Sequence, residues 1–334
     1  MSLMFNKKNY IRAASAGVLI ISIFAAGLLT GCEANKNQGN SNVVNAQTSD
    51  NSEEINKSES EKTVNDPAAN DSKVMEDFQA LLANNASLPE LIRFIDNNIS
   101  AVSKENATLM VDKLEEMQKK FLPGMDKKFY KDEDLQGKMS EAFMEDFDIS
   151  KIYDVEDTEL KQLLSETKDS GYKVETAEGM FFPVIDYEFY KKYSSYVTPD
   201  MKEYIDIMAV ESNNVPAKDA ALVIGWNEVL KRAINQEKLI SKYSDSIKIA
   251  DVKELYKKYV IFTLFGLNNT PLFSYETKVI DPKAKEAYLS ILESGEESGY
   301  IKIISDFVDL LEKNDYKLTD EVSKFRDGII ENMN

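Results

Sequence analysis

The stretch SLPELIRFIDNNISAVSKENATLMVDKLEEMQKKF, residues 87–121, decides the fold class. Ser87 and Glu90 have the spacing of a capping box, which satisfies free N–H groups at the start of a helix, and Ser103 can cap a further helix. Both segments repeat apolar residues at helical spacing: Leu91, Ile92, Ile95 and Ile99, then Leu109, Met110, Leu114, Met117 and Phe121. We therefore expect two amphipathic helices, the second ending at Pro123-Gly124.

The same periodicity continues on both sides of this stretch. It covers residues 74–82, 134–147, 158–168, 199–209, 217–243, 252–265, 282–293, 300–313 and 319–333. Gly171 and Gly266 are expected to end helices, whereas Pro199 and Pro216 are expected to open them. Because the connections are short, the sequence predicts a mainly α-helical fold of antiparallel helical layers or stacked helical hairpins.

One segment departs from the helical pattern. Tyr172, Val174 and Thr176 alternate with polar residues, Glu178-Gly179 follows, and residues 180–185 form the apolar run MFFPVI. This pattern predicts a small β-hairpin near residues 172–185. Pro183 cannot donate to a strand ladder, so it restricts the second strand to an edge or a bulge, or excludes a strand there.

The N-terminal region has a different composition. Lys7, Lys8 and Arg12 precede an apolar run from about residue 13 to residue 29, which ends in Leu29-Thr30-Gly31-Cys32. This stretch resembles the lipobox of bacterial lipoproteins. The resemblance implies cleavage between Gly31 and Cys32, a diacylglyceryl group on Cys32, and attachment to the cell membrane on its extracytoplasmic face. An uncleaved membrane anchor is the alternative, since the run is just long enough to cross a bilayer.

These patterns predict the organisation of the chain. Residues 1–31 are expected to be a lipoprotein signal peptide, and the polar residues 32–72 a disordered tether that cannot bury enough apolar surface to fold. Residues 73–334 are expected to form the helical domain, with a division into two halves near residues 172–185 as one option. Cys32 is the only cysteine, so this domain cannot contain an internal disulfide bond.

Composition excludes several classes of function. The chain has no histidine, which excludes Ser-His-Asp and Cys-His hydrolases and His-ligated metal sites. Its formal charge of −18 becomes about −21 without the signal peptide, because that segment carries three of the basic residues. Such a charge is repelled by phosphate backbones, so we expect no nucleic-acid partner. No cofactor and no metal ion are expected either.

Two groups of residues are candidates for ligand binding. Glu178, Asp186 and Glu188 surround the expected hairpin, and two carboxylates can perform glycoside hydrolysis without histidine. A solvated rim is the simpler explanation of these residues. Asn268 and Asn269 occupy a loop after Gly266, where turn formation is the alternative explanation.

Two aromatic features have similar alternatives. Tyr190, Tyr193 and Tyr196 lie three residues apart, which is close to the spacing of one helix face. They are expected either to pack in the core or to form an aromatic platform for a ligand, and Trp226 is expected in the core.

The sequence favours a non-catalytic role. We expect a lipid-anchored binding or interaction module of the cell envelope, with an envelope protein or a glycan as partner. A solute-binding lipoprotein of a transporter is one alternative, although such proteins usually need lobes of alternating strands and helices. A carboxylate-dependent envelope hydrolase is the other.

Overall fold

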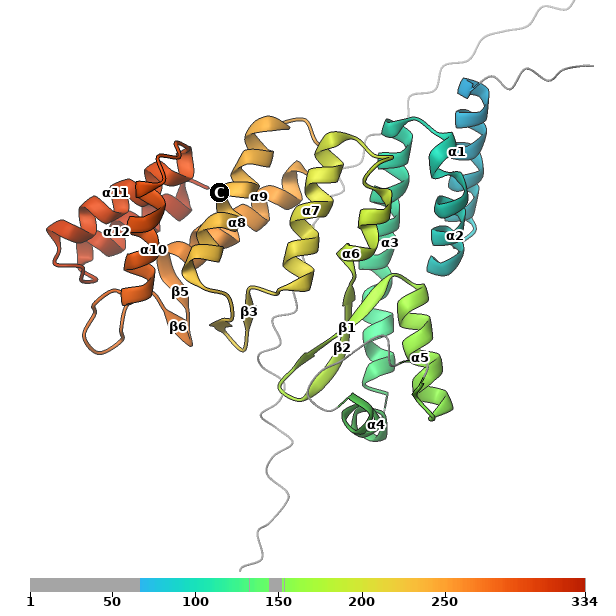
Figure 1. Cartoon of the computed structure of the whole chain (residues 1–334), viewed down its shortest axis with the longest axis horizontal. Helices are drawn as coiled ribbons and strands as arrows, with labels where there is room; N and C mark the ends of the chain where they lie inside the picture. Colours follow the sequence, from blue (N-terminus) through green and yellow to red (C-terminus); the bar gives the residue numbers. More distant parts are fainter. Residues whose placement is uncertain (1–66, 132, 144–151, 153, 334) are drawn as a thin grey trace, which may run out of the picture.

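The computed structural model describes residues 67–131, 133–143, 152 and 154–333. Within these ranges, twelve α-helices and three two-stranded antiparallel sheets follow one another along the chain. The helices lie side by side in one elongated array that advances from α1 to α12 (Figure 1). The mainly α-helical fold is therefore confirmed. No helix in these ranges is both long enough and apolar enough to span a membrane. Leu29-Thr30-Gly31-Cys32 lies outside the described residues.

The first part of the array contains five helices and one hairpin. Their bounds are α1 Pro67–Ala83, α2 Leu88–Asn98, α3 Lys104–Phe129, α4 Glu133–Phe143, α5 Thr158–Asp169, β1 Tyr172–Ala177 and β2 Met180–Ile185. The expected caps form. The Glu90 carboxylate accepts hydrogen bonds from the N–H (2.8 Å) and hydroxyl (2.7 Å) of Ser87. The Ser103 hydroxyl accepts one from the N–H of Asn106 (3.3 Å).

Helix α1 begins at Pro67, so it includes residues that the sequence assigns to the tether. Its start is bound to the start of α3. The Asp71 carboxylate accepts hydrogen bonds from the side-chain amide of Asn106 (2.7 Å) and from the N–H of Ser103 (3.1 Å). The first turn of α1 therefore gains tertiary contacts that its composition does not reveal.

Helix α3 continues to Phe129, and the expectation that Pro123-Gly124 ends it is wrong. Proline in a helix interior removes one hydrogen bond and usually breaks the helix. Here the extra turns bury Met125 and Phe129 in the core, and this burial offsets the cost.

The hairpin expected near residues 172–185 is confirmed. Tyr172 pairs with Ile185 at its base, and Ala177 pairs with Met180 at its tip. Glu178 (φ 51°) and Gly179 (φ 75°) form the two-residue turn, as in a type I′ hairpin. Pro183 lies within β2, which is tolerated because a two-stranded sheet has only edge strands.

The second part of the array adds six longer helices and two shorter hairpins. After the single-turn α6 Tyr187–Tyr190 come α7 Pro199–Asn213, β3 Ala217–Lys218, β4 Ala221–Leu222, α8 Trp226–Lys242, α9 Ile249–Phe265, β5 Gly266–Leu267, β6 Thr270–Pro271, α10 Pro282–Glu293, α11 Gly299–Lys313 and α12 Asp320–Glu331. The expectation that Pro216 opens a helix is wrong, because residues 217–222 form a hairpin and α8 begins only at Trp226.

Buried apolar side chains form two clusters. The first extends from Val74 to Ala209, includes both strands of the first hairpin, and adds Leu239 of α8 and Val252 of α9. The second extends from Ile224 to Val322. Ile207 and Met208 of α7 pack against both clusters. The first cluster is therefore formed mostly by elements up to α7, and the second mostly by elements from α8 onward. The buried side chains of the hairpin at residues 172–185 belong to the first cluster.

Candidate functional site

Three β-hairpins lie in a row along one edge of the helical array, at the lower side of Figure 1. Each hairpin has a two-residue turn, formed by Glu178-Gly179, Asp219-Ala220 and Asn268-Asn269. Each also follows the end of a helix, namely α5, α7 and α9. We call residues 175–180, 217–223 and 266–280 the hairpin edge.

Hydrogen bonds join the three hairpins to one another. The ammonium group of Lys218 in the second hairpin bonds the Glu175 carboxylate (2.9 Å) and the Thr176 carbonyl (2.9 Å) of the first. Asn269 in the third hairpin donates its main-chain N–H to the Ala220 carbonyl (2.9 Å) and its side-chain amide to the Asp219 carbonyl (2.7 Å). The edge is therefore one connected surface.

The central turn is strained and depends on its neighbour. Asp219 and Ala220 both have positive φ angles, 46° and 50°, and alanine has no side-chain group that compensates for the left-handed conformation. Asn269 binds the carbonyl groups of both residues. Asn269 therefore holds the second turn in place. Asn268 and Asn269 also form the turn of their own hairpin, as the turn-forming explanation expects.

The hairpin edge exposes apolar side chains. Tyr275 is 65% exposed and Val223 is 50% exposed, and Met180 and Val279 are also among the exposed large apolar residues. The hydroxyl of Tyr275 donates a hydrogen bond to the main-chain carbonyl of Asn268 (3.0 Å), which holds the ring beside the third turn. Each of the three hairpins thus exposes at least one apolar side chain.

The structure separates the three carboxylates that the sequence grouped together. Glu178 lies at the tip of the first hairpin, whereas Asp186 follows the end of β2 at its base, about 20 Å away at roughly 3.3 Å per residue. Glycoside hydrolysis needs two carboxyl groups about 5–10 Å apart. Glu178 and Asp186 therefore do not form such a pair.

Asp186 and Glu188 have structural partners. Asp186 caps α6 by accepting a hydrogen bond from the N–H of Glu188 (3.1 Å). The carboxylate of Glu188 pairs with Lys191 (2.8 Å) and accepts a hydrogen bond from the amide of Asn213 (2.8 Å). These two contacts lower the pKa of Glu188, whereas a general acid needs a raised pKa.

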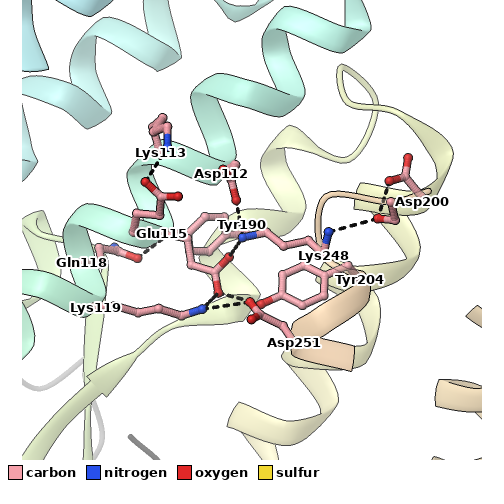
Figure 2. A network of polar contacts seen from close by, with 12 residues as sticks. Asp112, Lys113, Glu115, Gln118, Lys119, Tyr190, Asp200, Tyr204, Lys248 and Asp251 are labelled. Carbon is pink, nitrogen blue, oxygen red and sulfur yellow. Dashed lines mark hydrogen bonds and ion pairs between the residues drawn. The ribbon is translucent and has the colours of Figure 1, made fainter. Parts of the chain in front are cut away.

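A second group of polar residues lies inside the array, between α3, α6, α7 and the start of α9 (Figure 2). Glu115 is at its middle and is only 2% exposed. Its carboxylate pairs with Lys248 (2.6 Å) and Lys119 (2.8 Å). Lys248 also pairs with Asp112, and Lys119 with Asp251 (3.2 Å). We call these five residues the charge centre.

Glu115 and Lys248, the two most buried residues of the charge centre, are both ionised at neutral pH. Burial by itself would raise the pKa of Glu115, but the positive charges of Lys248 and Lys119 lower it to about 2. Burial opposes the charge on Lys248, but Glu115 and Asp112 raise the pKa of its ammonium group above the ordinary value. Each charge therefore depends on its neighbours.

Tyrosine side chains close the charge centre from the hairpin side. The hydroxyl groups of Tyr187 and Tyr204 each donate a hydrogen bond to the Glu115 carboxylate at 2.6 Å. Tyr190, one helical turn along, donates to the side chain of Gln118. Burial raises the pKa of all three hydroxyl groups well above the ordinary value, so they remain neutral donors.

The tyrosine row at residues 190, 193 and 196 is mostly core. Tyr190 and Tyr193 are buried, whereas Tyr196 is 38% exposed in the connection between α6 and α7. Trp226 is also buried, as expected, with its ring 6.4 Å from that of Tyr288. These aromatic residues stabilise the helices and do not form an aromatic platform.

A further ion pair joins α7, α8 and α9. The guanidinium group of Arg232 bonds Glu228 (2.9 Å), Glu211 (3.3 Å) and the hydroxyl of Tyr259 (3.1 Å). Tyr259 in turn donates to the Glu211 carboxylate (2.6 Å). This pair and the charge centre together connect elements that belong to different apolar clusters.

The charge centre was missed from the sequence. Glu115 and Lys119 lie four residues apart on α3, a spacing that indicates an ion pair on a helix, but the same spacing is common on solvated surfaces. Nothing near Lys248 in the sequence indicates that it reaches α3. Among the described residues, no three His, Cys, Asp or Glu side chains gather closely enough to hold a metal ion.

No protein-family model matches this chain, and neither a curated protein nor a solved structure shows detectable similarity to it.

Proposed function

We propose that this chain is a lipid-anchored, non-catalytic binding module of the bacterial cell envelope that holds a protein partner along the hairpin edge. The observation that carries the proposal is the row of three hydrogen-bonded hairpins, which exposes Met180, Val223, Tyr275 and Val279 along one edge of the array. Exposed apolar groups that lie together are typical of protein interfaces.

The rigidity of the hairpin edge supports this proposal. Lys218 and Asn269 bond each hairpin to the next, so the exposed side chains keep their relative positions before a partner arrives. A preorganised surface loses less conformational entropy on binding, which favours affinity. Tyrosine is also among the residues most often responsible for binding energy at interfaces.

The pairing of the charge centre supports a non-catalytic role. Catalytic groups need pKa values near the working pH, whereas Glu115 has a pKa of about 2 and is enclosed by lysines and tyrosines. We therefore interpret this cluster as a structural connection between the two parts of the array.

The proposed location depends on Cys32. The basic start, the apolar run and Leu29-Thr30-Gly31-Cys32 resemble a lipoprotein signal, and two acyl chains on Cys32 would anchor the protein durably. Without the signal peptide the net charge is about −21, which disfavours contact of the protein with anionic headgroups. We therefore expect the partner to be an envelope component other than the lipid bilayer.

Site-specific photo-crosslinking tests the proposal. Full-length protein is produced in its host with p-benzoylphenylalanine in place of Tyr275, and in a matched control in place of Tyr196. Both are exposed tyrosines. Tyr196 precedes the start of α7, whereas the second hairpin follows its end, so Tyr196 is far from the hairpin edge. We expect one adduct of defined mass at position 275 and none at position 196.

The remaining outcomes are also informative. Cys32→Ala should abolish the adduct if the partner resides in the envelope, because the protein would no longer be held there. Equal labelling at both positions, or no adduct at position 275, would contradict the hairpin edge as the binding surface. An adduct with a glycan would show that the partner is a carbohydrate and not a protein.

A further inference from the structure

Among the residues that the structure describes, two glutamines are completely buried, and their surroundings differ. Gln118 on α3 and Gln236 on α8 are both 0% exposed. The amide of Gln118 donates to the carbonyl groups of Ser170 (2.8 Å) and Gly171 (3.2 Å), and its oxygen accepts from Tyr190. Neither the oxygen nor the nitrogen of the Gln236 side chain has a hydrogen-bond partner among the described residues.

Arg232, one turn earlier on α8, also has a buried polar atom without a hydrogen-bond partner among the described residues. Its Nε and Nη1 atoms bond Glu228, Glu211 and Tyr259, but its buried Nη2 atom has no partner among the described residues. Residues four apart on a helix lie on the same face with their Cβ atoms about 5–6 Å apart. Two unsatisfied donor groups and one unsatisfied acceptor therefore share one face of α8.

This face lies at the junction of three helices. Arg232 contacts Glu211 on α7 and Tyr259 on α9, so its face of α8 is enclosed between these two helices. One turn before Glu211 in α7 are Ile207 and Met208, which pack against both apolar clusters and cannot satisfy an amide. The part of the chain that the structure describes therefore does not provide the missing partners.

The chemistry of the three atoms identifies the missing partner. Arg232 already faces the carboxylates of Glu211 and Glu228, so an anion would be repelled, and the Nη2 donor would repel a cation. A neutral molecule that both donates and accepts hydrogen bonds is required. Water meets this requirement, and buried water typically makes about three hydrogen bonds to polar groups that lack other partners.

We propose that Arg232 and Gln236 bind one or two internal water molecules between α7, α8 and α9. The water accepts hydrogen bonds from Nη2 of Arg232 and Nε2 of Gln236 and donates one to Oε1 of Gln236. This site is independent of the binding surface proposed above, because it is buried and lies on α8 away from the hairpin turns. Failure of either proposal leaves the other unaffected.

Nuclear magnetic resonance of the wild-type protein tests the site directly. Deuterated protein is labelled with ¹⁵N in glutamine side chains, and cross-relaxation between each side-chain amide and long-lived water is measured. We expect water cross-peaks at the Gln236 amide. Gln118 is the matched control, because it is equally buried and adjacent to a tyrosine hydroxyl, and therefore reports any signal relayed by hydroxyl exchange. Absence of a water contact at Gln236 would overturn the proposal.

A pair of variants provides a second test, because the change in Tm of Gln236→Met has opposite signs for a hydrated and a dry site. Methionine has nearly the shape of glutamine but cannot hold water. With water present, Gln236→Met should remove its partners and lower Tm by about 3–8 °C. If the site were dry, the same change would remove two unsatisfied polar atoms and raise Tm, which would refute the proposal. Gln118→Met should lower Tm without affecting the water signal at Gln236. If Gln236→Met fails to fold, the wild-type measurement alone decides.

Discussion

The Nζ atom of Lys248 lies 2.6 Å from Oε2 of Glu115, which joins the connection between α8 and α9 to the middle of α3. Both side chains are almost completely buried. The charge centre around them contains three carboxylates and two ammonium groups, so it carries one net negative charge (Figure 2). Its contribution to stability should depend on this balance.

Lys248→Met should destabilise the protein more than Glu115→Gln. Removing Lys248 leaves the buried Glu115 and its neighbour Asp112 with Lys119 as the remaining cation nearby, and uncompensated buried charges typically cost about 3–5 kcal/mol. Glu115→Gln instead leaves the centre neutral and keeps an acceptor for both tyrosines. Urea denaturation measures both. Lys119→Met, at a more exposed position, is the control and should cost about 1 kcal/mol. Equal losses for Lys248→Met and Lys119→Met would refute this interpretation.

Acid should weaken the charge centre over a defined pH range. The pKa of Glu115 is lowered from 4.5 to about 2 by folding, so its contribution is present above pH 4.5 and is lost as the pH falls toward 2. The difference in unfolding free energy between wild type and Glu115→Gln should therefore shrink between pH 4.5 and pH 2. Denaturation at pH 7, 4.5 and 3 checks this. A difference at pH 3 as large as that at pH 7 would contradict the lowered pKa.

Gly266→Ala should be far more harmful than Gly179→Ala, although both glycines have a positive φ. Gly266 (φ 71°, ψ −148°) occupies a region that other residues almost never adopt. A Cβ there would lie 2.6 Å from the Leu272 nitrogen and closer still to the Thr270 carbonyl oxygen. We expect a loss of about 3–5 kcal/mol. Gly179 has open space, so its loss should be about 1 kcal/mol. Thermal unfolding distinguishes the two, and similar losses would contradict the close approach at Gly266.

Asn269→Ala should destabilise the second hairpin, whereas Asn268→Ala should not. The side chain of Asn269 bonds the Asp219 carbonyl, and its loss should cost about 1 kcal/mol. Asn268 contributes its main-chain carbonyl, which the substitution preserves. Hydrogen exchange of the amides at residues 217–223 is the measurement. Faster exchange in Asn268→Ala than in Asn269→Ala would contradict the structural role of Asn269.

Cys32→Ala should abolish membrane attachment. If the resemblance to a lipobox is correct, the thiol of Cys32 is the sole site of acylation in this chain, since no other cysteine exists. Labelling with a radioactive fatty acid should mark the wild-type protein and leave Cys32→Ala unmarked. Label retained by the variant would refute lipidation at Cys32.

Sequence analysis predicted helices most successfully where local signals agreed. Ser103 and Pro199 mark helix starts, and Gly171 and Gly266 follow helix ends, because caps and turns depend on neighbouring residues. Prediction failed at Pro123 and Pro216. In the first case tertiary burial of Phe129 compensates for a helix breaker, and in the second a hairpin held by Asn269 replaces a helix.

The candidate residues show the same distinction. Glu178, Asn268 and Asn269 do lie on one edge of the array, in the turns of the first and third hairpins. The second hairpin connects these two, and the sequence did not predict it. Asp219 and Ala220 form its turn without glycine, so the usual signal of a two-residue turn is absent. Asp186 and Glu188 lie at the base of the first hairpin, whereas Glu178 lies at its tip. Their closeness in the sequence does not reveal that they are far apart in space.

The sequence by itself determined the helical class, the first hairpin and most helix boundaries, because these follow from apolar periodicity and from caps that act within a few residues. Only the tertiary structure decided which charges meet. Glu115 and Lys248 are ordinary surface residues by their local pattern, and their pairing arises because the fold brings α3 and the start of α9 together around these two buried side chains. Electrostatic contacts between distant segments leave no periodic signal, so they emerge only when the chain is folded.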